Sequence, residues 1–476
     1  MGAFSSWGSS LSLLLCVLPF TLRMFSSSAC FVEERSALMY IKSSLISVHA
    51  QMLPDSWGRG DDCCTWERVV CNNSTRRISR LDLSWIYWSS SMSTADDRWY
   101  LNFTVFSAFH DLEFLDLSWN SPTLISLEGS DALTKLRYLN LSGNGFGGSY
   151  LPLFSKFTSL EVLVLNGLNN ISGGLPPSAF EHLTNLQELS LSSNRFNGSL
   201  PASLFALPSL KILDLSSNSF TGSIPINSKS GPIALEVLDL RLNFISGTLP
   251  VTAFKNIRAL YLSNNGFSGS LPASLFSLPN LKILDLSYNS YQGHISVSSS
   301  SETIPLEVLD LSNNLIGGVL PNKQVLKTLP NLREVYLSSN QFNGNLPSFL
   351  FSLPHIERLD LSKNFLKGPI PINQNSNLSL SLKTLHFSRN NLSGRLSFSW
   401  LRKLTKLEEI DFSYNANLIL DINSPGWTPP FQLKQLILSG CDISKNIIAE
   451  PHFLSTQHHL EVLHLSDNNL FGMMPN

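Results

Sequence analysis

The feature that most constrains the fold is a string that returns roughly every 24–25 residues. Each copy has the form Leu-x-x-Leu-x-Leu-x-x-Asn. It runs from Leu210 to Asn218, again from Leu281 to Asn289, and again from Ile356 to Asn364. A fixed period of this length is typical of a protein built as a stack of similar turns, in which each turn contacts only its neighbours. Such a stack offers one long surface for binding, so we expect a binding protein.

Each position of the repeat has a physical role. The alternating Leu-x-Leu is a short strand, so its leucines face the core and its x residues face solvent. The Asn that follows lies where the chain turns, and its amide can satisfy backbone groups that the turn would otherwise bury unpaired. We expect these residues to stack as a ladder, with Cys441 on one rung. The predicted rungs are Asn120, Asn144, Asn169, Asn194, Asn218, Asn243, Asn265, Asn289, Asn314, Asn340, Asn364, Asn390, Asn415 and Asn468.

A second signature, Gly-x-[Leu/Ile]-Pro, follows the Asn in many copies. Gly permits a turn with positive φ, and Pro favours an extended return of the chain. The copies begin at Gly198, Gly222, Gly247, Gly269, Gly318 and Gly368. From about Leu112 to the end, the chain resembles the plant-specific class of leucine-rich repeat. The resemblance implies an α/β-type repeat solenoid, a right-handed leucine-rich-repeat superhelix, with about sixteen turns here.

Four cysteines cluster before the repeats, at Cys30, Cys63, Cys64 and Cys71. A small cap gains stability from disulfides in an oxidising compartment, and spacing alone allows three pairings. Together with Trp57 and Trp66, these cysteines make the segment resemble the amino-terminal cap of plant leucine-rich-repeat receptors, which implies the pairs Cys30–Cys63 and Cys64–Cys71. The segment departs from that cap at Glu67-Arg68, where the family often has a Gly.

These patterns divide the chain into three parts. Residues 1–29 contain a short apolar core followed by small residues, as in a cleaved secretory signal. Residues 30–80 form the predicted cap, and residues 81–476 form the predicted solenoid, which ends partway through a repeat. No later stretch approaches the roughly 20 apolar residues that a membrane-spanning helix needs. We therefore expect a secreted or cell-surface protein.

Glycosylation is consistent with secretion, because the chain carries eight Asn-x-Ser/Thr sequons. Asn, Ser and Thr are common in this repeat, so no single sequon is strong evidence of a glycan. The candidates are Asn72, Asn73, Asn102, Asn140, Asn170, Asn197, Asn377 and Asn391. A net charge of −2, with no basic stripe, argues against nucleic acid or an anionic membrane as a partner.

The concave face is where we expect a ligand. Its middle position is most often Asp, and because the same Asp recurs in turn after turn, we interpret it as an ordinary solvated part of the repeat. Residues that interrupt this uniform surface are more informative, since aromatic side chains and Arg often anchor interfaces. The predicted ligand-binding residues are Tyr261, Tyr288, Tyr336, Arg358, Lys363, His386 and Arg389.

Catalytic motifs are missing from the sequence. It contains no phosphate-binding Gly-rich loop, no Gly-x-Ser-x-Gly, no kinase signature and no Cys/His cluster at zinc spacing. We therefore expect neither an enzyme nor a cofactor or metal site.

The resemblance implies a receptor-like protein of plant defence or development, which binds a peptide, glycan or protein and signals through a partner kinase. Full-length relatives continue into a membrane helix that this chain does not contain. Two alternatives stay open. A secreted inhibitor of cell-wall-degrading enzymes shares the cap and the repeats but has roughly ten turns. A truncated receptor fragment without independent function would explain why the chain stops within a repeat, at Asn476.

Overall fold

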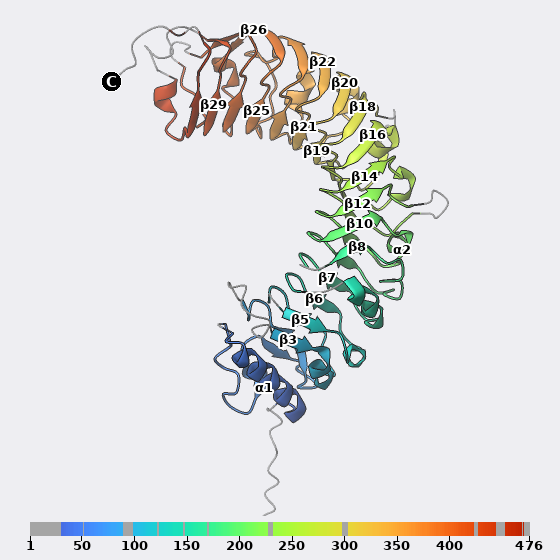
Figure 1. Ribbon diagram of the computed structural model, residues 1–476. Helices are drawn as coiled ribbons and strands as arrows, with labels where there is room; N and C mark the ends of the chain where they lie inside the picture. The colour runs from blue at the N-terminus through green and yellow to red at the C-terminus, as the bar shows by residue number, and fades with distance from the viewer. Residues whose placement is uncertain are drawn as a thin grey trace, which may run out of the picture.

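The chain forms a long curved solenoid, seen edge-on as an arc in the computed structural model (Figure 1). The structure describes residues 30–50, 52–88, 99–120, 123–145, 148–168, 171–226, 232–297, 303–422, 427–443, 453–468 and 470. The predicted secretory signal, Asn169 and Asn170 lie outside these ranges. The helix α1 is at one end of the arc, and the last strands are at the other (Figure 1).

The cap is built on helix α1 (Val32–Ser47), whose buried face includes Leu38, Ile41 and Leu45. A short helix, η1 (Cys63–Thr65), follows, and strand β1 (Val69–Cys71) then pairs antiparallel with β2 (Ile78–Asp82).

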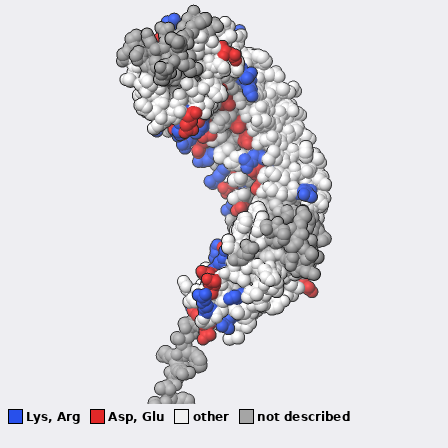
Figure 2. Space-filling model, turned by 60° about the vertical axis from the view of Figure 1, so that its left-hand side comes forward, with Lys and Arg blue, Asp and Glu red and all other residues white. Residues whose placement is uncertain are grey.

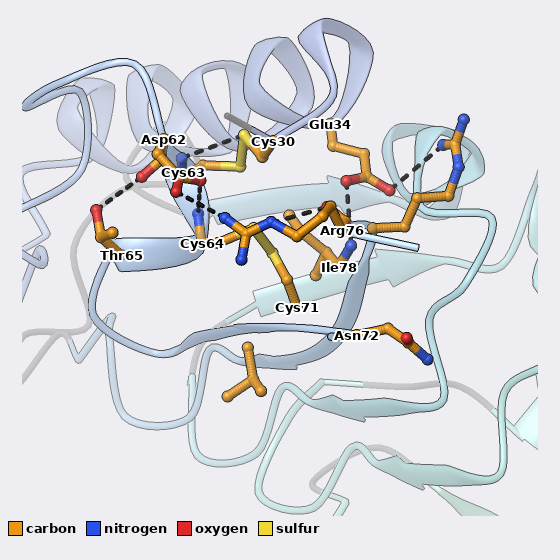
Figure 3. The surroundings of a disulfide bond; sticks show 12 residues. Cys30, Glu34, Asp62, Cys63, Cys64, Thr65, Cys71, Asn72, Arg76 and Ile78 are labelled. Carbon is orange, nitrogen blue, oxygen red and sulfur yellow. Dashed lines mark hydrogen bonds and ion pairs between the residues drawn. A yellow bond between two sulfur atoms is a disulfide. The ribbon is translucent and has the colours of Figure 1, made fainter. Parts of the chain in front are cut away.

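Two disulfides, Cys30–Cys63 and Cys64–Cys71, tie these elements together (Figure 3). This confirms the pairing that the resemblance implied. Arg68 stands where the family often has Gly, and it adopts the left-handed conformation with φ 66°. The turn is therefore kept although the Gly is absent.

The concave face is a seventeen-stranded sheet in which every neighbour pair after β1–β2 is parallel. After β2 the strands are β4 (Phe114–Asp116), β6 (Tyr138–Asn140), β7 (Val162–Val164), β9 (Glu188–Ser190), β11 (Ile212–Asp214), β13 (Val237–Asp239), β15 (Ala259–Tyr261), β17 (Ile283–Asp285), β19 (Val308–Asp310), β21 (Glu334–Tyr336), β23 (Arg358–Asp360), β25 (Thr384–His386), β27 (Glu409–Asp411), β29 (Gln435–Ile437) and β31 (Val462–His464). The strands are short, and from β4 to β29 the central residue of each is a buried Leu, Ile or Val.

A second, twelve-stranded parallel sheet forms from the residues that follow the ladder Asn. Its strands are β8 (Ser172–Gly174), β10 (Arg195–Ser199), β12 (Ser219–Gly222), β14 (Phe244–Gly247), β16 (Gly266–Ser270), β18 (Ser290–Gly293), β20 (Leu315–Val319), β22 (Gln341–Asn345), β24 (Phe365–Gly368), β26 (Asn391–Ser397), β28 (Asn417–Asp421) and β30 (Asp442–Ile443). Gly198 and Gly222 have φ of 74° and 79°, as the Gly-x-[Leu/Ile]-Pro signature predicts.

Short helices return the chain along the outer side of the arc. They are η3 (Phe103–Ala108), η4 (Ser130–Ala132), η5 (Gly148–Lys156), α2 (Ala202–Phe205), η6 (Val251–Ala253), η7 (Ala273–Ser277), α3 (Lys323–Leu326), η8 (Ser348–Ser352), η9 (Phe398–Leu401) and η10 (Leu454–Thr456). A small parallel pair, β3 (Trp99–Asn102) with β5 (Thr123–Ser126), lies beside α1 (Figure 1).

The Asn ladder forms as the sequence predicts on the described rungs; the predicted rung Asn169 lies outside the described residues. Asn415, for example, donates Nδ2 to the carbonyls of Phe387 and Phe412 at 3.0 and 2.9 Å, and its Oδ1 accepts from the Leu392 amide at 3.0 Å. On its rung, the Cys441 thiol donates to the Phe412 carbonyl at 3.1 Å. Together the sheets, the ladder and the capped end confirm the predicted leucine-rich-repeat solenoid.

Candidate functional site

Three columns of side chains line the concave sheet, because each strand places one residue inward and two outward. On β21, Val335 is buried, while Glu334 and Tyr336 flank it on the solvent side, half-buried. Parallel pairing keeps these positions in register from strand to strand, as in Asp310↔Tyr336↔Asp360. The first column therefore contains Glu334 and its equivalents, and the second contains Tyr336 and its equivalents.

The third column lies at the turn just before each ladder Asn. Its members adopt a left-handed backbone although most are not glycine; Tyr288, Lys363 and Arg389 have φ of 52°, 53° and 54°. This conformation is uncommon for residues with a side chain. It recurs in nearly every turn, so it belongs to the geometry of the repeat. All three of these side chains are exposed.

The Asp residues of the second column do more than face solvent. Asp310 accepts hydrogen bonds from the amide and the hydroxyl of Ser312 at 2.9 and 2.7 Å, and Asp285 and Asp411 bond Ser287 and Ser413 in the same way. Burial raises the pKa of Asp310. The recurring Leu-Asp-Leu-Ser is thus explained by a turn that the carboxylate holds. The solvated-group interpretation overlooked this role.

A row of alternating charges borders the sheet next to the first column. Pairs on consecutive turns approach within 4 Å, for example Lys282–Glu307 at 2.8 Å. The other pairs of this row are Arg137–Glu161, Arg258–Glu236, Arg333–Glu357, Lys383–Glu357 and Lys434–Glu408. Figure 2 shows charged side chains gathered on the hollowed side of the arc, while the outer surface in view is mostly uncharged.

Polar side chains gather on four neighbouring strands, β21 to β27, and hydrogen bonds join β23 to β25 and β25 to β27. Tyr336 Oη donates to Glu334 Oε2 at 3.0 Å. Arg358 Nη1 donates to Thr384 Oγ1 at 3.2 Å, and Thr384 in turn donates to Glu409 Oε2 at 3.4 Å. We call these residues, with His386, the concave polar network: Glu334, Tyr336, Arg358, Thr384, His386 and Glu409.

One described member of the network, His386, has a side-chain nitrogen without a hydrogen bond, and Tyr336 keeps its hydroxyl proton. Nε2 of His386 is buried and lies 3.4 Å from Glu409 Oε2, without the geometry of a hydrogen bond. Partial burial and the neighbouring Glu334 carboxylate raise the pKa of Tyr336, so its hydroxyl stays a neutral donor. Polar groups held in this way retain capacity to bond a ligand.

The structure brings only some of the predicted ligand-binding residues together. Tyr336, Arg358 and His386 belong to the concave polar network, and Lys363 and Arg389 lie on the adjoining turns of the third column. Tyr261 lies three strands away from Tyr336, on β15, with the Arg241 guanidinium 4.8 Å from its ring. Tyr288 is 55% exposed on the turn after β17. Glu334, Thr384 and Glu409 were not predicted; the contacts of Thr384 and Glu409 are with residues of neighbouring turns, and Glu334 accepts from Tyr336 of its own strand.

The amino-terminal part of the concave face is aromatic instead. Phe114 stacks on Tyr138 with ring centroids 4.2 Å apart, and the Arg80 guanidinium covers the other face of Phe114 at 3.4 Å. Trp85 and Trp119 stack at 5.4 Å. These rings cover one another's faces, whereas the concave polar network combines charged side chains with an unsatisfied nitrogen, Nε2 of His386.

The Asn side chains of the sequons differ in their exposure and in their hydrogen bonds. Asn73, Asn102, Asn197, Asn377 and Asn391 are exposed, and Asn72 and Asn140 are half-buried. Asn140 lies on β6 in the concave sheet and donates Nδ2 to Asp116 at 3.2 Å. Asn170 lies outside the described residues.

The described part of the chain contains no group of three or more His, Cys, Asp and Glu residues placed to hold a metal ion. Within the same residues, no helix has both the length and the apolar character required to cross a bilayer.

Comparison with family models finds the leucine-rich-repeat amino-terminal domain at residues 33–72 and leucine-rich repeats at 135–157, 158–220, 256–278, 305–323, 331–353 and 456–472. Receptor-like protein 13 of Arabidopsis thaliana is 33% identical over 97% of this chain, which spans 43% of that relative.

Solved structures show the same architecture. A TDR receptor superposes with a TM-score of 0.58 at 25% identity, over 78% of this chain and 66% of that one. The Arabidopsis receptor kinase HAESA, solved with the peptide hormone IDA and the co-receptor SERK1, gives 0.54 at 22% identity, over 93% of this chain and 95% of that one. At 22% identity, the similarity to HAESA shows a shared fold alone.

Proposed function

Since the chain belongs to the leucine-rich-repeat family of plant receptor-like proteins, we propose that it recognises an extracellular ligand through the concave polar network and the two cations beside it. The observation that carries this proposal is the combination of a polar network, which includes the unsatisfied Nε2 of His386, with two free cations on one stretch of the concave face. Along much of the rest of the described concave face, charges are paired or aromatic rings cover one another.

The ligand chemistry follows from the groups that are available. Lys363 and Arg389 are exposed, and no carboxylate of the described residues lies within 4 Å of their charged nitrogens. The Arg389 guanidinium instead lies 4.5 Å from the Tyr414 ring. Two such cations favour a ligand with an anionic group, and Tyr336 and His386 offer hydrogen bonds beside them.

An extended peptide fits this arrangement best. Neighbouring strands stand about 4.8 Å apart, so the four strands β21–β27 and their turns make a strip of roughly 15–20 Å, the length of five or six extended residues. A glycan or a protein loop of similar chemistry is the less favoured ligand. We include no catalytic step, because recognition alone accounts for these residues.

Signalling through a kinase-bearing partner at the cell surface is part of the proposal. Its support is the family membership and the fold shared with HAESA, whose structure contains a peptide hormone and a co-receptor. Secretion is supported by the two disulfides of the cap, since such bonds persist in oxidising compartments.

The test is capture of peptides from plant extracellular fluid on the immobilised chain, identified by mass spectrometry. Tyr336→Ala and Arg358→Ala should each weaken binding of a captured peptide by ~1–3 kcal/mol, as expected for central anchors. Lys363→Ala and Arg389→Ala should each cause a smaller loss of affinity, because both side chains are exposed. That loss should be larger at low salt than at high salt, since salt screens the attraction between exposed charges.

The matched control is Lys327→Ala. Lys327 is an exposed cation at the end of α3, on the outer side of the arc, so its removal should change affinity little. Loss of binding in Lys327→Ala with full binding in Tyr336→Ala would overturn the concave assignment, and would point to the outer side instead.

A further inference from the structure

A groove of about 870 Å³ lies between the cap and the first turns of the solenoid, away from the concave polar network. It is lined by Tyr40 and Ser44 of α1, Tyr100 and Asn102 of β3, Val105 of η3, and Ser126 of β5. We call it the Asn102 groove. Its volume is within the range of sites that hold small molecules.

The alternation along β3 explains why the groove is lined by these side chains. Trp99 and Leu101 are buried, whereas Tyr100 and Asn102 face out. Trp99 also donates its indole N–H to Ser44 Oγ at 3.0 Å, which fixes α1 against β3. Two large aromatic side chains are left uncovered, Tyr100 at 60% and Tyr40 at 66% exposure. Exposed aromatics on the walls of one groove favour an occupant with an apolar face.

Asn102 is both a wall of this groove and the first residue of the sequon Asn102-Phe103-Thr104. Its Oδ1 caps η3 by accepting from the Thr104 amide at 2.9 Å. Its Nδ2 has one contact, with Glu128 Oε2 at 3.5 Å, the limit of a hydrogen bond. A substituted Nδ2 keeps one hydrogen, so Asn102 can carry a sugar while it continues to cap the helix.

We propose that Asn102 carries an N-linked glycan whose first N-acetylglucosamine residues occupy the Asn102 groove and pack against Tyr40 and Tyr100. In the transfer step, Nδ2 bonds to the anomeric carbon of a lipid-diphosphate-linked oligosaccharide. The bond from that carbon to the phosphate oxygen breaks, and the lipid diphosphate leaves as Nδ2 loses one proton. The sugar rings place their C–H faces on the tyrosines, and their hydroxyls meet Ser44 and Ser126.

The glycan would then join two structural units. Its root is on β3, and one of its packing partners, Tyr40, is on the cap helix α1. Covering exposed aromatic surface stabilises the docked arrangement. The proposal requires only that the chain passes through the secretory pathway, and it is independent of the concave ligand.

The experiment uses the full chain secreted from eukaryotic cells, without any ligand. Glycopeptide mass spectrometry should find Asn102 occupied in most molecules. Thr104→Val removes the sequon but keeps the backbone amide that Asn102 caps, and Thr104→Ser keeps the sequon. Thr104→Val should lower the melting temperature by several degrees, and Thr104→Ser should not change it. Trimming the glycan enzymatically to its first sugar should retain most of the stabilisation.

The packing itself is tested by a double-mutant cycle. Tyr40→Ala should lower the melting temperature in the glycosylated protein and change it much less in the Thr104→Val background, because the two partners act together. Asn391→Gln is the matched control, since Asn391 is an exposed sequon on β26 that does not line this groove. An unmodified Asn102, or an equal effect of Tyr40→Ala in both backgrounds, would overturn the proposal.

Discussion

The cap and the solenoid are stabilised in different ways. In the cap, each important contact occurs once: two disulfides, a stacked pair of tryptophans with centroids 6.3 Å apart (Trp57 and Trp66), and one buried carboxylate, Glu34. In the solenoid, the same leucines and the same Asn bonds recur in most turns. A single change should therefore cost more in the cap, where no neighbour repeats the lost contact.

Glu34 is the sharpest example of a contact that occurs once. Its side chain is 0% exposed, and Oε2 accepts from the Ile78 amide at 3.1 Å, which links α1 to β2 (Figure 3). Arg77 lies 3.5 Å from the other oxygen. Burial outweighs both contacts and raises the pKa of Glu34 to about 7.

The largest effect should come from opening the longer disulfide, Cys30–Cys63, which closes 33 residues of the cap. Replacing both cysteines by Ser should destabilise the cap by ~2–5 kcal/mol, as for other small disulfide-linked units. Hydrogen exchange should then show faster opening of α1, with the solenoid beyond β15 unchanged. Equal acceleration throughout the chain would mean that the cap and the solenoid unfold as one unit.

Removing one Asn side chain from the ladder should reduce stability less than opening this disulfide. Asn289→Ala leaves the carbonyls of Leu262 and Leu286 and the amide of Phe267 without their partner, at an expected cost of ~1–3 kcal/mol. Asn415→Ala should cost more within this range, because Asn415 is fully buried and Asn289 is partly exposed. A thermal melt that is unchanged in both variants would show that the ladder does not stabilise the turns.

The difference between repeated and single contacts also explains what could be predicted from the sequence. The concave strands, the ladder and the positive φ of Gly198 follow from a pattern that occurs many times, so each copy supports the others. The disulfide pairing came from the resemblance to a known cap, since spacing alone left three choices. These predictions are confirmed.

The candidate site was predictable only in part, because its contacts join residues from different turns. Tyr336 and His386 were found because they interrupt the Asp column, and Arg358 because it is a large cation in the neighbouring column. Glu334, Thr384 and Glu409 lie in that same, more variable column and gave no signal. Nor could spacing show that Tyr261 pairs with Arg241, or that Phe114 and Tyr138 cover each other. Such contacts depend on register across the sheet, which one repeat does not contain. The ligand-binding role of all seven predicted residues stays a prediction.

The pH dependence of stability should distinguish the cap from the solenoid. Because the pKa of Glu34 is raised from 4.5 to about 7 in the folded chain, the folded state holds the proton more tightly. The stabilisation is complete below pH 4.5 and is lost as the pH rises through about 7. Between pH 5.5 and 7.5 the expected loss is about 1–2 kcal/mol.

Glu34→Gln should remove most of this pH dependence, because Gln keeps the length of the side chain and cannot ionise. The measurement is the melting temperature, or exchange of α1 amides, across that pH range. Asp310→Asn is the control, because it removes a carboxyl of the solenoid whose pKa is also raised by burial. It therefore tests whether the pH dependence of α1 belongs to the cap carboxyl and not to a buried carboxyl elsewhere. If Glu34→Gln retains the full slope, other groups carry the pH dependence.

The smallest expected effect concerns Cys441. Here the cap and the solenoid should differ in the reactivity of their cysteines and not in stability. The four cap cysteines are oxidised, whereas Cys441 is a free, buried thiol whose Sγ donates to the Phe412 carbonyl on a ladder rung. Burial raises its pKa to about 11, so little reactive thiolate forms at pH 8. An alkylating reagent should modify almost no Cys441 in the native protein and all of it after denaturation, while the cap cysteines react only after reduction. Rapid native labelling of Cys441 would show that this turn opens locally, and would make the carboxyl-terminal turns, like the cap, a region that unfolds separately from the central solenoid.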